Sequence, residues 1–220
     1  MGPGRDPTRT LAACDRILVL GRTGSGKTTL ARRLAAALEV PHVELDSLYF
    51  GPGFSTVSLP VLRERTTAAI AAERWVIDGN KRAVRDLVWP RADTIVWLDY
   101  PLGVSLWRLT RRARRRTAVL KAEAGAETGL PRQLLAGGKG VLTALRSHAG
   151  QRREYPRMFA QPANRHLAVV RLRSPRATRR WLEAATAEAG ASLRTASAAA
   201  PAEPGPRPPG VGGHRVAGTS

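Results

Sequence analysis

The sequence predicts an α/β domain in which a parallel β-sheet lies between two layers of helices. Short apolar runs alternate with longer segments of helical spacing, and a glycine-rich turn joins the first run to the first helix. Of the 220 residues, 43% are hydrophobic, which is enough for one domain with a substantial core. This composition excludes wholesale disorder, which requires low hydrophobicity.

Five apolar runs have the length and composition of buried strands. Most are rich in valine, isoleucine and leucine, and a glycine or an acidic residue commonly follows them. We therefore expect strands at 16–20, 42–45, 75–77, 94–98 and 167–172.

The segments between these runs have the apolar spacing of amphipathic helices. Pro41 marks the end of the first helix and Pro101 opens the fourth. Residues 47–58 have the composition of a loop, and the five tryptophans are expected in the core. The expected helices are 27–39, 59–73, 81–88, about 102–117 and 175–189.

The two ends of the chain have a different composition. Residues 1–14 are polar and are expected to form a flexible leader, and residues 190–220 are expected to form a disordered tail of Ala, Pro, Gly and Ser. The single cysteine, Cys14, excludes an internal disulfide framework and suits a cytoplasmic location. No apolar run approaches the roughly 18 residues of a membrane span, so no membrane partner is expected.

The strongest motif runs from Gly21 to Thr28 and reads G-R-T-G-S-G-K-T, which matches G-x-x-x-x-G-K-[ST] in full. Glycines allow backbone N–H groups to surround a phosphate, and the following helix N-terminus adds partial positive charge. Lys27 can reach the β- and γ-phosphates, and Thr28 can bind Mg²⁺. The motif predicts ATP and Mg²⁺ as cofactors, with the nucleotide held by Gly21, Thr23, Gly24, Ser25, Gly26, Lys27, Thr28 and Thr29.

Three acidic residues, Asp46, Asp78 and Asp99, directly follow expected strands. In an open parallel sheet the ligand crevice lies at the carboxyl ends of the strands, which places Asp46 and Asp78 well for function. Asp99 precedes Tyr100 and Pro101, so a helix N-cap and a functional role remain equal alternatives for it.

Several segments together resemble the adenylate-kinase-like P-loop proteins, and in particular the subgroup called DNA topology modulation protein, or FlaR-like. The resemblance covers roughly residues 16–185. It rests on Ile17–Ala31, His42–Asp46, W-V-I-D-G-N at Trp75–Asn80 and T-I-V-W-L-D-Y-P at Thr94–Pro101. It implies a three-layer P-loop NTPase fold whose five-stranded parallel sheet has the order 2-3-1-4-5.

The resemblance also implies roles for individual residues. Asp78 would help to hold Mg²⁺ together with Thr28, and Asp46 would lie on the acceptor side. Arg82 would stand where these kinases place an acceptor-binding arginine. The kinase-like domain would span 15–189, with a nucleotide-kinase-like, arginine-rich lid at about 117–150.

The positive charge of the chain is concentrated in one segment. Residues 1–100 contain 14 basic and 11 acidic residues (+3), residues 101–180 contain 19 and 3 (+16), and residues 181–220 contain three of each. Arginines stabilise the charge that develops in phosphoryl transfer. The candidate lid arginines are Arg108, Arg112 and Arg116, with Arg152 and Arg153 expected to contact substrate from the other side.

These observations predict an ATP-binding kinase that transfers the γ-phosphoryl group to a small acceptor such as a nucleoside or nucleotide. The catalytic residues would be Lys27, Asp46, Asp78, Arg108, Arg112 and Arg116, and the substrate-binding residues would be Asp46, Arg82, Arg152 and Arg153. The alternative is an ATP-dependent protein that binds nucleic acid through the basic residues 108–157. The acceptor and the oligomeric state are left open by the sequence.

Overall fold

A computed structural model of the chain describes residues 14–51, 55–111, 114 and 150–199. It contains a five-stranded sheet of β1 (Arg16–Gly21), β2 (His42–Glu44), β3 (Trp75–Asp78), β4 (Thr94–Leu98) and β5 (Ala168–Leu172). The strand order is β2-β3-β1-β4-β5, and every neighbouring pair is parallel. The predicted fold class and strand order are confirmed.

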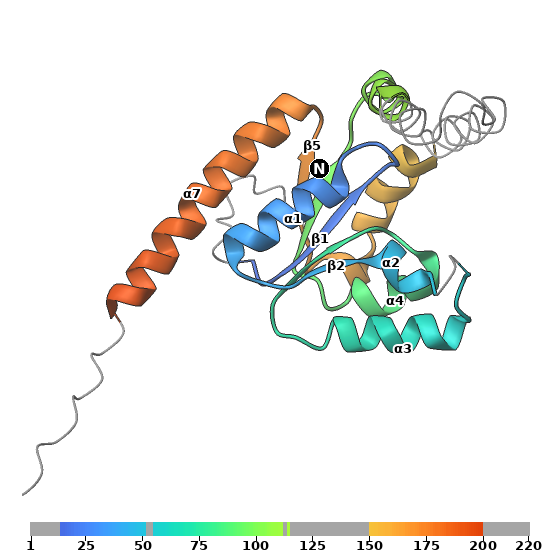
Figure 1. The fold of residues 1–220 in the computed structure, drawn as a ribbon, viewed down its shortest axis with the longest axis horizontal. Helices are drawn as coiled ribbons and strands as arrows, with labels where there is room; N and C mark the ends of the chain where they lie inside the picture. Colours follow the sequence, from blue (N-terminus) through green and yellow to red (C-terminus); the bar gives the residue numbers. More distant parts are fainter. Residues whose placement is uncertain (1–13, 52–54, 112–113, 115–149, 200–220) are drawn as a thin grey trace, which may run out of the picture.

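Alternate residues of β1 pack into two separate cores. Ile17 and Val19 face α1 (Lys27–Leu38) and α7 (Pro175–Ala199), whereas Leu18 and Leu20 face the opposite side. That side is covered by α3 (Leu59–Ala69), α4 (Arg85–Val88) and a helix at 150–159. Figure 1 shows α1 and α7 on one side of the sheet and α3 and α4 on the other. The result is a three-layer arrangement.

Helix α1 follows the phosphate loop because its sequence suits both a helix and the core. Leu30, Leu34 and Leu38 repeat every four residues and are buried on one face. The helix ends at Glu39, whose positive φ of 54° closes its last turn, and Pro41 begins the path to β2. Burial of each leucine favours folding by about 1.5–3 kcal/mol.

The strand positions follow the prediction closely, but the segments between the strands differ in detail. A short helix, α2 (Leu45–Tyr49), begins inside the expected strand and extends into the expected loop 47–58. The expected helix 59–73 ends at Ala69, and the expected helix 81–88 divides into the 3₁₀ turn η3 (Arg82–Val84) and α4. Helices this short lack the repeated spacing that sequence periodicity needs.

Both predicted chain ends require a correction. Cys14, expected in the leader, is buried in the core at 2% exposure. Helix α7 continues to Ala199, so residues 190–199 are helical rather than part of the predicted tail. Alanine has the highest helix propensity, which explains this extension. Residues 1–13, the lid positions 117–149 and the tail from residue 200 lie outside the described residues.

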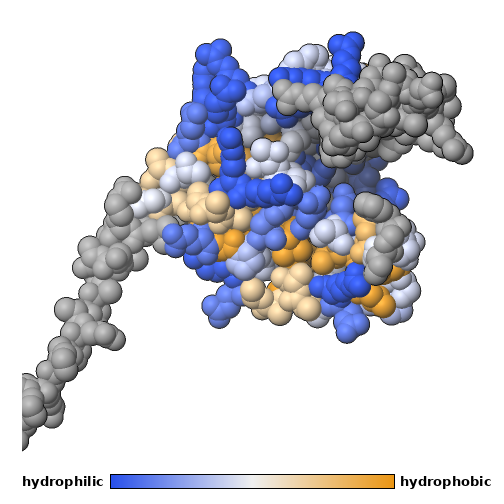
Figure 2. All heavy atoms as spheres, in the orientation of Figure 1, coloured by the Kyte–Doolittle hydropathy of each residue, from blue (hydrophilic) through white to orange (hydrophobic). Residues whose placement is uncertain are grey.

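Tryptophans and other large hydrophobic residues are mostly but not entirely buried. Trp75, Trp89 and Trp97 are core residues, whereas Trp107 is 59% exposed and does not fit the expectation. On the face seen in Figure 2, hydrophobic residues appear in small areas between hydrophilic ones. Within the described ranges, no helix is both long and apolar enough to cross a membrane.

Candidate active site

The phosphate loop lies between β1 and α1 and depends on glycine at two inner positions. Gly24 and Gly26 have positive φ values of 80° and 90°. A Cβ at Gly24 would lie 2.8 Å from Leu109 Cγ and 3.0 Å from the Ser105 carbonyl oxygen. Glycine is therefore needed at Gly24 both for its backbone conformation and for the close approach of the helix at 102–111.

Arg108, on that same helix, lies directly on the phosphate loop. Its Nη1 donates a hydrogen bond to the Ser25 carbonyl oxygen at 2.7 Å, and its guanidinium lies 5.3 Å from the centre of the Tyr100 ring. The structure therefore brings this predicted arginine to the loop. Arg112 and Arg116 lie outside the described residues.

Lys27 begins α1, and the charges of three carboxylates act on it. Its Nζ donates a hydrogen bond to the Arg22 carbonyl oxygen at 3.4 Å. Burial lowers the pKa of Lys27, while the carboxylates of Asp78, Asp46 and Glu44 act in the opposite direction. The fold thus brings Lys27 within electrostatic reach of both Asp46 and Asp78.

Asp78 ends β3 and faces Thr28 at the start of α1. The Thr28 hydroxyl lies 3.4 Å from Asp78 Oδ1, and the Asp78 side chain is 3% exposed. His42, which the sequence analysis did not select, places Nε2 3.0 Å from Asp78 Oδ2. His42 is the first residue of β2, and only the packing of β2 beside β3 brings it to Asp78.

The hydroxyl and carboxylate oxygens of Thr28 and Asp78 fit Mg²⁺ well. This ion prefers oxygen ligands and usually takes one or two protein groups together with substrate phosphates. Among the residues that the structure describes, no cluster of three or more His, Cys, Asp or Glu could hold a metal by itself. The donor set is therefore of the kind that suits a nucleotide-bound Mg²⁺.

Asp46 lies in the first turn of α2 and is ion-paired with Lys81. The distance from Lys81 Nζ to Asp46 Oδ1 is 3.1 Å, and the same Nζ lies 4.2 Å from the Tyr49 ring centre. The Asp46 side chain is 57% exposed, so a ligand entering from solvent can reach it. Its role towards the acceptor stays a prediction.

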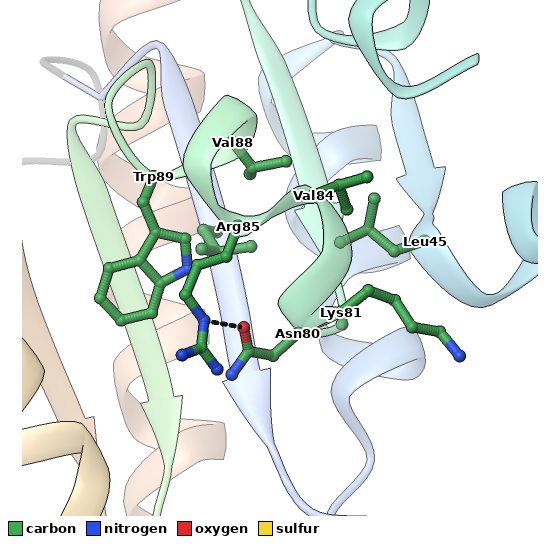
Figure 3. Close-up of a pocket in the computed structure, with 9 residues that line it drawn as sticks. Leu45, Asn80, Lys81, Val84, Arg85, Val88 and Trp89 are labelled. Carbon is green, nitrogen blue, oxygen red and sulfur yellow. Dashed lines mark hydrogen bonds between the residues drawn. The ribbon is translucent and has the colours of Figure 1, made fainter. Parts of the chain in front are cut away.

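A pocket beside β1 and β3 has an apolar floor and a polar rim (Figure 3). Leu45, Val84 and Val88 contribute to the floor, while Asn80 and Arg85 meet at the rim. Arg85 Nε donates a hydrogen bond to Asn80 Oδ1 at 3.1 Å. These residues follow the D-G turn after β3, at the end of the sheet where ligands bind in such folds.

Arg85 lines this pocket, whereas the predicted acceptor arginine Arg82 does not. The Arg82 side chain is 80% exposed, and its Nη2 lies 3.3 Å from Glu154. Arg85 is 20% exposed, pairs with the same Glu154 at 3.2 Å and lies 5.6 Å from the Trp89 ring centre. The family resemblance implied Arg82 as the acceptor arginine, whereas Arg85, which follows the 3₁₀ turn η3, is the arginine in the pocket lining.

Asp99 ends β4 and is almost fully buried, at 1% exposure. Its Oδ1 accepts a hydrogen bond from Arg152 Nε at 2.7 Å, and its Oδ2 accepts one from Arg171 Nε at 3.0 Å. The Asp99 carboxylate thus anchors two arginines and does not cap the helix at 102–111. Arg153 is exposed and has no ion-pair partner within the described part of the chain.

Comparisons with known proteins found no matching family model and no matching curated protein. Among solved structures, the chain is similar to a gluconokinase from Sinorhizobium meliloti (17% identity, TM-score 0.44, covering 86% of this chain and 98% of that one). It is also similar to a shikimate kinase from Bacteroides thetaiotaomicron (18% identity, TM-score 0.45, covering 83% of this chain and 99% of that one). A third similar structure is a sugar kinase from Janibacter sp. (22% identity, TM-score 0.42, covering 80% of this chain and 98% of that one).

These likenesses are distant, so the fold assignment rests on the molecule's own features. The sheet order β2-β3-β1-β4-β5 and the G-x-x-x-x-G-K-T loop between β1 and α1 occur together. A parallel sheet with this loop after its first strand is the arrangement of phosphate-binding P-loop proteins. The chain therefore has the three-layer P-loop NTPase fold.

Proposed function

We propose that this protein is an ATP- and Mg²⁺-dependent phosphotransferase that moves the γ-phosphoryl group of ATP to a small acceptor. The observation that carries the proposal is the convergence of Lys27, Thr28 and Asp78 at one end of the sheet. Thr28 Oγ1 lies 3.4 Å from Asp78 Oδ1, and Lys27 lies within electrostatic reach of the same carboxylate. A phosphate loop, a lysine and a pair of oxygen ligands are the parts that phosphoryl transfer requires.

Each residue has a distinct part in the proposed reaction. The backbone N–H groups of the loop bind the phosphates, and the Lys27 ammonium neutralises charge on the transferred group. Thr28 and Asp78 would hold Mg²⁺, which supplies further neutralisation of phosphate charge when bound. Arg108 lies on the loop and would contact the nucleotide, and Asp46 would orient the acceptor hydroxyl.

The W-V-I-D-G-N segment at Trp75–Asn80 supports a small acceptor of the nucleoside or nucleotide type. The same segment supports an adenylate-kinase-like protein of the DNA topology modulation subgroup. The single cysteine supports a cytoplasmic location.

The test is phosphoryl transfer from labelled ATP with Mg²⁺ to a panel of nucleosides, nucleotides and small alcohols. We expect transfer to a member of the panel and its loss in Lys27→Ala. Arg33→Ala is the control, because it removes one positive charge from the exposed face of the same helix and should leave transfer unchanged. ATP binding without transfer to any acceptor would contradict the proposal.

A second function, nucleic-acid binding, is favoured by the unpaired arginines in the basic segment. Arg111, Arg114, Arg153 and Arg157 have no carboxylate partner among the described residues, and Arg111 lies 5.3 Å from the exposed Trp107 ring. Exposed arginines without carboxylate partners can bind phosphate backbones without reading sequence. Duplex DNA binding that weakens steeply with salt would support it, and the absence of binding at low salt would exclude it.

A further inference from the structure

The buried carboxylate of Asp99 has no part in the roles assigned so far. A charged group at 1% exposure is costly unless it is paired, and Asp99 is paired twice. It accepts hydrogen bonds from Arg152, on the helix at 150–159, and from Arg171, on β5. These contacts join a helix that is distant in sequence to the end of the central sheet.

The two arginines are held in different ways. Arg171 donates hydrogen bonds to Asp99 Oδ2 from both Nε (3.0 Å) and Nη2 (2.5 Å). Its guanidinium lies 4.4 Å from the Trp97 ring centre. Arg152 donates a hydrogen bond to Asp99 from Nε alone, and within the described residues its two Nη atoms have no hydrogen-bond partner. The Arg152 side chain is 42% exposed. Arg152 therefore keeps the forked end that binds phosphate oxygens.

This arrangement lies beside the phosphate loop. Arg22, in the loop, is 3% exposed, donates a hydrogen bond to the Tyr100 carbonyl oxygen and has an Nη1 without a partner in the described structure. Burial lowers the pKa of Arg22, Asp99 opposes this effect, and the nearby charge of Arg152 adds to it. Arg152 and Arg171 contact the Asp99 carboxylate, and Arg22 donates to the carbonyl oxygen of the next residue, Tyr100. These three guanidinium groups and one carboxylate carry a net charge of +2 at the phosphate loop.

We propose that Asp99 is a positioning residue that holds Arg152 beside the phosphate loop, where the free Nη atoms of Arg152 stabilise the transferred phosphoryl group. The inference rests on the proposed phosphotransferase function. During transfer, the bond from the γ-phosphorus to the ADP oxygen breaks while the acceptor oxygen bonds to phosphorus, and the acceptor proton leaves to a base or water. Arg152 exchanges no proton and supplies only charge and hydrogen bonds.

The proposal separates Arg152 from Arg153, which sequence grouped together. Arg153 follows directly on the same helix, yet it makes no contact with Asp99 or another carboxylate among the described residues. The role of Arg152 therefore depends on the ion pair with Asp99 and not on the general positive charge of the segment.

The first test is Arg152→Ala. Asp99 keeps Arg171, so the variant should fold. We expect kcat to fall about 10²–10³-fold while KM for ATP changes little, because the lost contact forms mainly in the transition state. Added guanidinium ion at millimolar concentration should restore part of kcat. Arg165→Ala is the matched control, since this exposed arginine precedes β5 at the opposite end of the sheet from the loop.

The second test is Asp99→Asn, alone and combined with Arg152→Ala. We expect Asp99→Asn to lower kcat, to add little to the loss in the Arg152→Ala background and to resist guanidinium rescue. If the asparagine variant does not fold, Asp99→Glu keeps the charge but shifts the carboxylate, and kcat should still fall.

Two outcomes would overturn the positioning role. One is an Arg152→Ala variant with the kcat of the wild type. The other is a double variant whose loss in kcat equals the product of the losses in Arg152→Ala and Asp99→Asn. Either result, with wild-type transfer intact, leaves the phosphotransferase function standing. A wild-type protein that transfers no phosphoryl group would instead contradict the proposed function, and the role of Asp99 would fall with it.

Discussion

At the scale of single residues, the candidate site depends on close approaches that few side chains tolerate. Gly24 is the sharpest case, because its φ is 80° and Leu109 lies against the position of a missing Cβ. Gly103, on the same helix as Leu109, has nothing within 4 Å of the equivalent position. The two glycines therefore differ in what an added methyl group would do.

We expect Gly24→Ala to weaken ATP binding by about tenfold or more, because the loop must shift to relieve a 2.8 Å contact and a strained φ. Gly103→Ala should leave ATP affinity unchanged and stabilise the protein by about 0.4–1 kcal/mol. Calorimetric titration with ATP and urea unfolding measure both effects. Equal affinity in the two variants would show that the helix at 102–111 does not press on the loop.

Tyr155 gives a second residue-scale prediction, which concerns alkaline pH. The residue is 1% exposed, its hydroxyl accepts a hydrogen bond from Asn80 Nδ2 at 3.1 Å, and burial raises its pKa. An unfolded tyrosine ionises near pH ~10, so folding stability from Tyr155 is complete below that pH and is lost as pH rises further.

We expect Tyr155→Phe to lose about 1 kcal/mol at pH 8 through the missing hydrogen bond, but to lose less stability than the wild type between pH 9 and 11. Tyr100, whose pKa burial also raises, remains in both proteins and leaves a shared alkaline loss. Urea midpoints across this range measure the difference. Parallel curves for the two proteins would remove Tyr155 from the alkaline transition.

At the scale of elements, α7 continues for ten residues beyond its last buried residue among those whose burial is described. Leu182, Ala185 and Ala189 are buried against the α1 side of the sheet, and Ala189 is the last buried residue described in the helix. The helix continues to Ala199. In Figure 1 its far end extends away from the body of the domain.

Truncation at the C-terminal end of α7 and substitution of its buried Leu182 should have different effects on stability. Removal of residues 192–220 should alter the free energy of unfolding by less than ~1 kcal/mol, because the buried contacts remain. Leu182→Ala should cost about 2–5 kcal/mol through a cavity in the core. Urea unfolding of both variants tests this, and a large loss on truncation would assign a packing role to the extension.

At the scale of the whole molecule, charge and fold together bias the protein towards anionic ligands. The formal charge is +19, and residues 101–180 contribute +16 of it. In the described part of that segment, Arg108 donates a hydrogen bond to the phosphate loop. Arg152 donates one to Asp99, and the Arg171 guanidinium lies against the Trp97 ring. A nucleotide bound at the phosphate loop would lie close to Arg108, and its binding should stabilise the domain.

We expect Mg²⁺ and ATP at about 100 times the dissociation constant to raise the free energy of unfolding by about 2.7 kcal/mol. Lys27→Ala should lose most of this gain, since Lys27 contributes the positive charge at the start of α1. Thermal unfolding with and without the nucleotide provides the measurement. An equal shift in both proteins would place the nucleotide away from the phosphate loop.

Some residues of the candidate site can be identified from one short segment of the sequence, and others cannot. The phosphate loop and the acids after the strands were readable because each lies in one short segment. The pairs Arg152–Asp99 and Arg171–Asp99 join residues that are 53 and 72 positions apart, and no local pattern indicates them. His42 and Arg85 were missed for the same reason, since strand packing brings one to Asp78 and the turn η3 carries the other into the pocket lining.

The amino-acid sequence alone was sufficient for the fold class, the strand positions and the phosphate loop. Apolar runs form strands wherever they are buried, and the glycine pattern of the loop has few other uses. Tertiary structure was needed to select among arginines of equal charge, with Arg108 on the loop, Arg152 on Asp99 and Arg85 in the pocket lining. The physical reason is that the role of an arginine depends on the carboxylate and carbonyl groups to which it donates hydrogen bonds. The tertiary fold determines which of these groups lie beside it.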